Sequence, residues 1–139
     1  MTFRWRDSYS IGNADIDAEH QQLFRLANAF FEASDKASRL ECAMRLFQYT
    51  KEHFGHEEAL MREIAYPAMA AHMAQHQVLI GSLNKVTESI TKDTLQPDQL
   101  RKFLTAWLVG HIVTFDTKLS TYLNFRAPGR DAQRESQPE

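Results

Sequence analysis

The fold of this chain is decided by residues 51–76, which read KEHFGHEEALMREIAYPAMAAHMAQH. Four of the six histidines of the protein fall within this stretch. Side chains four positions apart lie on the same face of an α-helix. His53 and Glu57 therefore share one helix face, and His72 and His76 share another. The stretch predicts two helices that each carry part of a metal site.

Apolar residues continue at helical spacing on both sides of this stretch and predict four helices. The expected helices cover residues 17–34, 39–65, 67–91 and 97–125. Because the connections between them are short, neighbouring helices should run antiparallel. We therefore expect an all-α, up-down-up-down four-helix bundle, formed as a single domain over residues 1–125.

The two ends of the chain lack the helical period. Residues 1–16 predict an extended arm that lies across the bundle and ends at a helix N-cap, either Asp15 or Asp17. Trp5 is interpreted as the packing anchor of this arm rather than as a ligand contact. Residues 126–139 contain no apolar residue larger than alanine besides prolines, so we expect a disordered tail.

Composition excludes several classes of partner. The net charge of −2 is too small to favour nucleic acid or an anionic membrane. No apolar run approaches the roughly 18 residues of a membrane span, and the first twenty residues lack the apolar segment of a signal peptide. The single Cys42 offers no internal disulfide. We expect a cytoplasmic protein, and a monomer, with oligomers left open.

Two acidic residues on inward faces are the informative exceptions to the apolar pattern. Glu57 is costly to bury unless it is paired or bound to a metal. In the last helix the apolar stripe slips by one residue after His111, and on an ideal helix His111 and Asp116 would point ~140° apart. Both can face inward if one residue is looped out between them, so the slip predicts a π-bulge.

The inward polar residues are predicted to lie at similar positions along the length of the bundle. Counted from the connections at residues 34–38 and 92–96, they lie at one level, roughly 20 to 28 Å along the helices. Hydrogen-bonded core histidines are the alternative interpretation, and the convergence of four helices favours metal binding. The expected ligands are His20, His53, Glu57, His72, His76, His111 and Asp116.

Five imidazoles and two carboxylates are too many donors for one ion. Zinc usually takes four ligands and would leave three of them unused. Two six-coordinate iron ions use all seven, if both carboxylates and an oxide or hydroxide bridge the ions, and one coordination position then stays open. The inward apolar residues within about two turns of the ligands are Leu23, Phe54, Phe103 and Trp107.

These four residues predict an apolar pocket beside the open position. We find no inward side chain placed as a nucleophile or general base, so we expect a protein that is not an enzyme. A dry pocket with one open metal position favours the binding of a small apolar gas.

Four motifs together resemble the bacterial hemerythrins, over nearly the whole chain from the arm to residue 125. They are IDAEH at 16–20, HFGHEEALM at 53–61, YPAMAAHMAQH at 66–76 and WLVGHIVTFD at 107–116. The resemblance implies an oxo- or hydroxo-bridged, non-haem di-iron centre that binds dioxygen reversibly. It also implies that one iron takes His72, His76 and His111, while the other takes His20 and His53 and keeps the open position, with Glu57 and Asp116 as bridges.

Two residues depart from the resemblance outside the ligand set. Glu19 stands where we expect glutamine, and His56 is an additional histidine; both leave the binding chemistry intact and could alter autoxidation. The resemblance favours oxygen storage, delivery or buffering. The alternatives are an oxygen or redox sensor that acts through a separate partner, di-iron turnover of peroxide or nitric oxide, and simple iron storage.

Overall fold

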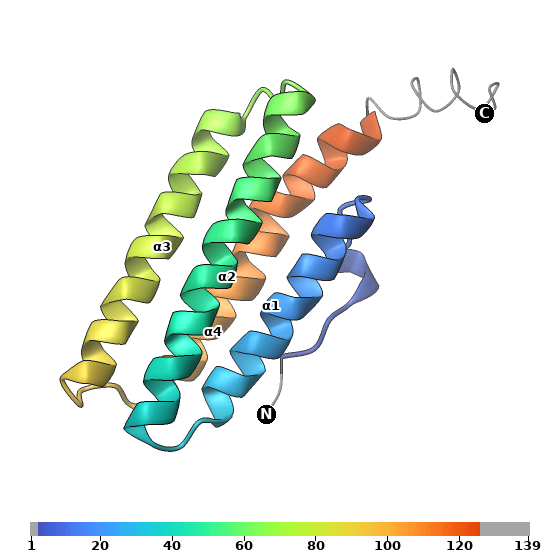
Figure 1. The fold of residues 1–139 in the computed structure, drawn as a ribbon. Helices are drawn as coiled ribbons and strands as arrows, with labels where there is room; N and C mark the ends of the chain where they lie inside the picture. The colour runs from blue at the N-terminus through green and yellow to red at the C-terminus, as the bar shows by residue number, and fades with distance from the viewer. Residues whose placement is uncertain (1–2, 126–139) are drawn as a thin grey trace.

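The computed structural model describes residues 3–125, which form four long helices lying side by side (Figure 1). The fourth helix begins as α4 and continues through two π-helical segments, η2 and η3, before returning to α-helix over residues 117–125. The bounds are α1 Ala14–Glu32, α2 Lys36–Glu63, α3 Met69–Thr91, α4 Pro97–Leu104, η2 Thr105–Gly110 and η3 Ile112–Asp116. The predicted tail, residues 126–139, lies outside the described residues.

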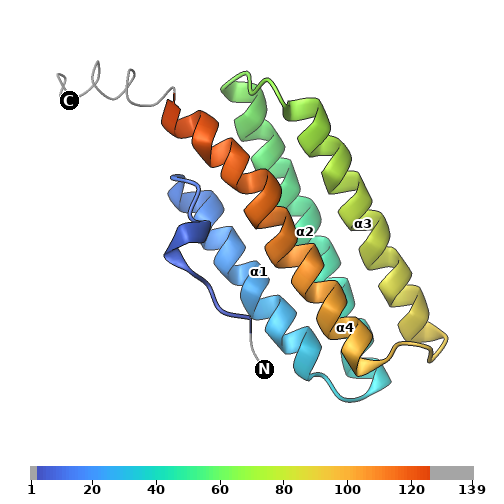
Figure 2. The same ribbon diagram turned by 180° about the vertical axis from the view of Figure 1, so that it is seen from behind.

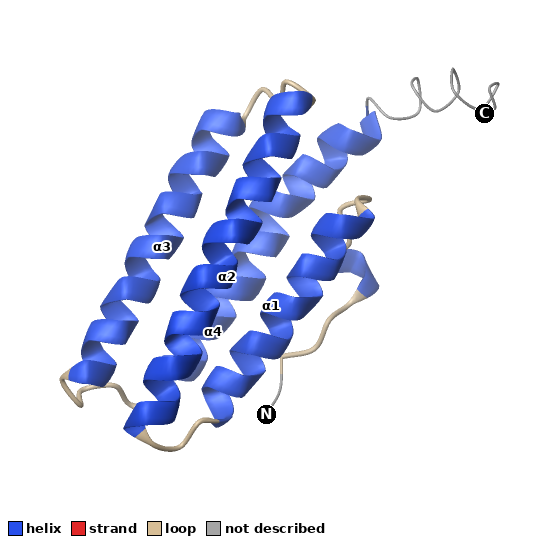
Figure 3. Ribbon diagram, viewed as in Figure 1, coloured by secondary structure: helices blue, strands red, loops and turns tan. Residues whose placement is uncertain are grey.

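Successive helices alternate in direction, and this confirms the predicted four-helix bundle. Helix α2 packs against both α1 and α3, and α1 also contacts α4. Seen from behind, the fourth helix lies between α1 and α3 and closes the bundle (Figure 2). All regular structure over residues 3–125 is helical (Figure 3). In that part of the chain, no helix is long and apolar enough to cross a membrane.

Helix α1 starts earlier than the sequence predicts. Its N-cap is Asn13, whose side chain accepts a hydrogen bond from the Ile16 amide at 3.0 Å. The prediction that Asp15 or Asp17 caps this helix is wrong. Both lie in the first helical turn instead, where their negative charge favours the positive end of the helix dipole.

The arm before α1 is held along the outside of the helix by side chains of α1. Asp17 accepts a hydrogen bond from the Ile11 amide at 2.8 Å. Asn28 binds the backbone of Phe3 twice: its Oδ1 accepts from the Phe3 amide at 2.6 Å, and its Nδ2 donates to the Phe3 carbonyl at 3.0 Å. The arm is thus fastened at both ends.

The middle of the arm is not fully extended, because residues Asp7–Tyr9 form one turn of 3-10 helix. This turn brings Tyr9 against Trp5, with ring centroids 5.6 Å apart. Trp5 also packs edge-on against Phe24 at 5.7 Å. Its expected role as a packing anchor is confirmed, and its ring lies 6.4 Å from that of His20.

The turn between α2 and α3 is wider than the sequence predicts. Ala65 takes a left-handed backbone conformation with φ of 53°, and the Tyr66 amide reaches back to the Met61 carbonyl at 2.9 Å. This ends α2 in the manner of a helix C-cap. Pro67 falls within the turn, and α3 begins at Met69 rather than at the proline.

The predicted π-bulge in the last helix is confirmed. Two π-helical segments, η2 and η3, flank His111. Extra residues in these wide turns rotate the following face of the helix. His111 and Asp116 consequently both point inward, at 5% and 0% exposure.

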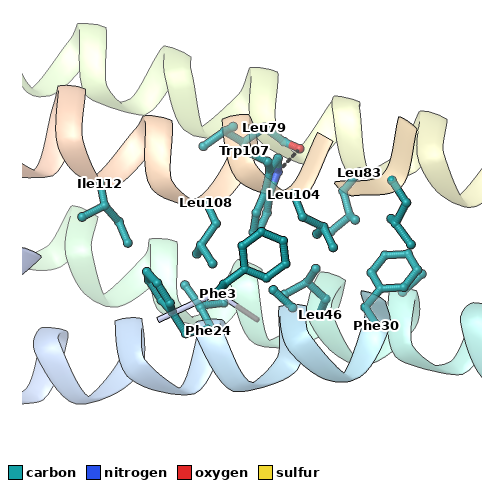
Figure 4. Close-up of a cluster of buried hydrophobic side chains, with 14 of the residues drawn as sticks. Phe3, Phe24, Phe30, Leu46, Leu79, Leu83, Leu104, Trp107, Leu108 and Ile112 are labelled. Carbon is teal, nitrogen blue, oxygen red and sulfur yellow. Dashed lines mark hydrogen bonds between the residues drawn. The ribbon is translucent and has the colours of Figure 1, made fainter. Parts of the chain in front are cut away.

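Apolar side chains from all four helices fill the bundle between the inward polar residues and the connections at residues 33–35 and 92–96 (Figure 4). The Trp107 indole belongs to this core and donates a hydrogen bond to the Leu79 carbonyl at 2.9 Å. A second apolar cluster lies at the opposite end of the bundle and includes Ile16, Met61 and Leu119. Along three of the helices, the inward polar residues lie between these two apolar clusters, which shield them from water.

Candidate metal centre

All seven expected ligand residues meet inside the bundle, and each is at most 5% exposed. They come from all four long helices, and the π-helical segments on either side of His111 bring both His111 and Asp116 to the inward face. Donor atoms of six of them form two groups, within each of which the atoms lie no more than 4.8 Å apart. One group holds Glu57, His72, His76 and His111, and the other holds His20, His53 and Glu57.

Glu57 belongs to both groups because its two oxygens face opposite ways. Its Oε1 faces three imidazole Nε2 atoms: His72 at 2.7 Å, His76 at 2.9 Å and His111 at 3.8 Å. Its Oε2 faces two, His20 at 3.4 Å and His53 at 3.5 Å. This is the arrangement expected of a carboxylate that links two ions, one per oxygen.

Asp116 spans the same two groups from the opposite helix. Its Oδ1 lies 3.1 Å from His72 Nε2 and 3.2 Å from His111 Nε2. Its Oδ2 lies 3.1 Å from His20 Nε2. Asp116 thus faces two histidines of the first group with one oxygen and one histidine of the second group with the other.

The donor atoms fit a pair of metal ions better than they fit one another. Several are fully buried without any hydrogen-bond partner, which is costly unless a cation takes that place. These atoms include Nε2 of His20, His53 and His111, Oε2 of Glu57 and both oxygens of Asp116. Imidazole-rich sites with few carboxylates suit iron, copper, nickel or zinc, and donors in two linked groups suit two such ions.

The protonation states also indicate a site prepared for cations. Burial acts to lower the pKa of His20 and of His72, but Asp116 and Glu57 outweigh it and raise both values to about 9. Burial acts to raise the pKa of Glu57, yet the surrounding histidines hold it well below its ordinary value. The metal-free site therefore binds protons where metal ions would bind, and metal uptake must release them.

Two carboxylates outside the ligand set bind the far nitrogens of ligand histidines. His53 Nδ1 donates to Glu19 Oε1 at 2.8 Å, and His76 Nδ1 donates to Glu58 Oε2 at 2.8 Å. Ligand histidines commonly make such a bond, which orients the ring and strengthens the metal-facing nitrogen as a donor. Glu58 was not expected to have a role; the tendency of ligand histidines to bind a carboxylate through the far nitrogen is the signal that could have found it.

A small apolar cavity lies against the site, and its volume is about 10 Å³. That is at the lower limit for a single water molecule. Three of the four expected pocket residues, Leu23, Phe54 and Trp107, line it. The other apolar lining residues, Leu79, Leu108 and Ile112, were not expected from the sequence.

Phe103 does not line the cavity, which corrects the fourth expected position. Its half-buried ring packs against Trp107 instead, with centroids 6.2 Å apart. The buried position at this level is taken by Leu104, directly before the helix widens into η2. Phe103 lies eight residues before His111, about 12 Å along the helix, and Trp107 occupies the position between them.

The cavity adjoins one side of the centre. His20 and His53, which form the two-histidine group with Glu57, both line it. His111 lines it from the other group, whereas His72 and His76 do not. The side with fewer protein donors is therefore the side with open space.

A helical bundle with five buried imidazoles and two linking carboxylates on facing helices defines a class of metal-binding four-helix proteins. Residues 12–123 match the hemerythrin HHE cation-binding domain. The chain belongs to the hemerythrin family.

Similar proteins agree with this assignment. A bacteriohemerythrin of Stenotrophomonas maltophilia is 32% identical over 78% of this chain and 72% of its own length. A bacteriohemerythrin of Ralstonia nicotianae is 26% identical over 96% of both chains. A crystal structure of a hemerythrin mutant has the same fold, with a TM-score of 0.76 over 86% of this chain and 95% of that one, at 22% identity.

Proposed function

We propose that this protein binds dioxygen reversibly at a non-haem di-iron centre and serves in oxygen storage, delivery or local buffering. The observation that carries the proposal is the apolar cavity of about 10 Å³ against the two-histidine side of the site. Space of this size admits one very small molecule and no larger substrate. The two irons, when bound, supply the reversible binding chemistry.

The roles of the ligand residues follow from their geometry. His72, His76 and His111 would hold one iron, and His20 and His53 the other. Glu57 and Asp116 would link the two ions, since each turns one oxygen toward each group of histidines. The five protein donors on the first side and four on the second leave the second side for an external ligand, beside the cavity.

The apolar lining favours binding over catalysis. Among the described residues that line the cavity, those other than the ligand histidines are Leu23, Phe54, Leu79, Trp107, Leu108 and Ile112. None of these side chains can act as a nucleophile or exchange a proton with a substrate at neutral pH. We therefore propose that the protein is not an enzyme, and that it works in the cytoplasm, as its single cysteine led us to expect.

An optical experiment tests the proposal. Iron-loaded protein is reduced without oxygen, its iron is counted per chain, and its spectrum is recorded before and after air is admitted. We expect about two irons and a visible band that appears in air and disappears under argon. A stable oxidised spectrum that argon does not reverse, or steady consumption of peroxide or nitric oxide, would replace the oxygen-binding role with a sensor or an enzyme.

A further inference from the structure

Glu19 stands between a buried ligand histidine and a histidine on the surface. Its Oε1 accepts a hydrogen bond from His53 Nδ1 at 2.8 Å, and its Oε2 accepts one from His56 Nδ1 at 2.6 Å. The side chains are 1% exposed at His53, 20% at Glu19 and 62% at His56. The three residues thus form a chain of contacts that leads from solvent to a donor of the metal centre.

Within residues 3–125 this arrangement occurs on one side of the centre only. Glu58 makes the corresponding contact with His76 on the three-histidine side, but no histidine binds its other oxygen among the described residues. Nδ1 of His20, His72 and His111 has no partner in this part of the chain. Among the described carboxylates outside the ligand set, Glu19 is therefore the one that accepts a hydrogen bond from an imidazole on each of its oxygens.

The surroundings explain why Glu19 needs the second contact. A surface groove of about 490 Å³ runs beside Glu19 and His56 and gives water access to both. A glutamate at such an edge has several rotamers open to it, and water competes for its oxygens. The bond from His56 holds the outer oxygen, so the inner oxygen stays directed at His53.

The electronic consequence concerns the metal-facing nitrogen. A carboxylate that accepts the Nδ1 proton makes the imidazole a stronger donor through Nε2. A stronger donor favours the more highly charged state of the ion that it binds. His53 Nε2 points to Glu57 and to the two-histidine group, so this effect would fall on the side that adjoins the cavity.

We propose that Glu19, held in place by His56, is a positioning residue that keeps His53 oriented as an Nε2 donor and lowers the reduction potential of the iron on the cavity side. The inference rests on the di-iron centre of the proposed function. His56 acts only through Glu19, and neither residue touches the iron itself.

The test compares iron-loaded wild type with Glu19→Gln, His56→Phe and the double variant at one constant pH. The readouts are the midpoint potential of the centre and the rate of iron loss to a chelator. Glutamine keeps the shape of Glu19 without its charge, so the potential should rise, and iron should be lost about ten-fold faster or more. His56→Phe should move both readouts in the same direction by less.

The double variant and two controls separate this mechanism from general destabilisation. Because His56 acts through Glu19, His56→Phe should add nothing in the Glu19→Gln background. Glu58→Gln changes the partner of His76 on the other side, so its effect should add to that of either variant. His56→Gln, which still offers an N–H donor to Glu19, should restore values close to wild type.

Each possible result either supports or overturns the proposed role of Glu19 and His56. An unchanged potential in folded, iron-loaded Glu19→Gln would overturn the inference and leave the proposed function standing. Full additivity of Glu19→Gln and His56→Phe would also overturn it. If Glu19→Gln fails to fold, the exposed pair His56→Phe and His56→Gln gives the answer, since equal potentials in the two would refute the contact. A wild type that takes up no iron would overturn both the inference and the proposed function.

Discussion

The ring of Phe54 stacks face to face on the imidazole of His76, with centroids 3.7 Å apart and planes 5° from parallel. Phe54 also lines two separate spaces, the cavity against the metal centre and a groove of about 350 Å³ on the surface between α2 and α3. One aromatic side chain thus both supports a ligand histidine and separates the cavity from solvent.

Replacing this wall should expose the centre to water. Phe54→Leu keeps the site apolar but removes the stacked ring, so we expect the oxygenated protein to autoxidise faster than wild type. The rate is measured from the loss of the visible band in air. Phe103→Leu is the matched control, because Phe103 is a half-buried aromatic residue that does not line the cavity. Equal rates in the two variants would show that Phe54 does not seal the cavity.

Asp116 contacts both histidine groups, so its loss should affect both ions. Asp116→Ala removes two donor oxygens and leaves His20, His72 and His111 without the carboxylate that now faces them. We expect fewer than two irons per chain, measured by metal analysis after reconstitution. Asp98→Ala, an acidic residue in the first turn of α4, should keep the wild-type iron content. Two firmly held irons in Asp116→Ala would contradict the linking role.

Leu23 tests the cavity without touching a metal donor. The residue is 3% exposed and lines the cavity, so Leu23→Ala should enlarge it and cost about 2–5 kcal/mol of unfolding free energy. Both irons should be retained, because all seven donors remain, while autoxidation becomes faster. The measurements are urea unfolding, iron content and the decay of the visible band. Loss of iron would show that Leu23 supports the ligands rather than the cavity.

The metal-free protein should lose stability as the pH rises above neutrality. His20 and His72 have an ordinary pKa of 6.5, and in the fold the carboxylates Asp116 and Glu57 raise it to about 9. The stability from these protonated imidazoles is fully present below pH 6.5 and is lost as the pH rises through 9. The lowered pKa of Glu57 acts oppositely, since its contribution is lost only in acid.

Urea unfolding of the metal-free protein at pH 6 and pH 9 measures this effect, with greater stability expected at pH 6. Metal binding should show the reverse trend, because the ions displace the same protons and bind more tightly at higher pH. His20→Gln should reduce the difference between the two pH values in the metal-free protein. A metal-free stability that is the same at both pH values would show that the buried histidines are neutral without metal.

Local spacing was enough to predict much of this protein. The four helices follow from the period of apolar residues, and polar residues on those apolar stripes identify all seven expected ligands. Even the wide turns around His111 were visible as a slip of one residue in the stripe. A helix has a fixed pitch, so sequence spacing alone determines which side chains share its inward face.

The helix ends and the cavity required the structure. Asn13 rather than Asp15 or Asp17 caps α1, because several adjacent residues can cap a helix and the path of the arm selects one. Phe103 was expected in the cavity and lies outside it, because Trp107 packs between Phe103 and the ligands and fills the space next to them.

The sequence by itself determined the bundle and the set of donors, because both depend on the position of each residue within its own helix. Only the tertiary structure decided that Glu19 bridges His53 and His56, that Glu58 supports His76, and that Phe54 divides the cavity from the surface. Each of these contacts joins side chains of different helices or separates two spaces between them. Such contacts depend on the distance and rotation between packed helices. The spacing of residues within one helix determines neither of these.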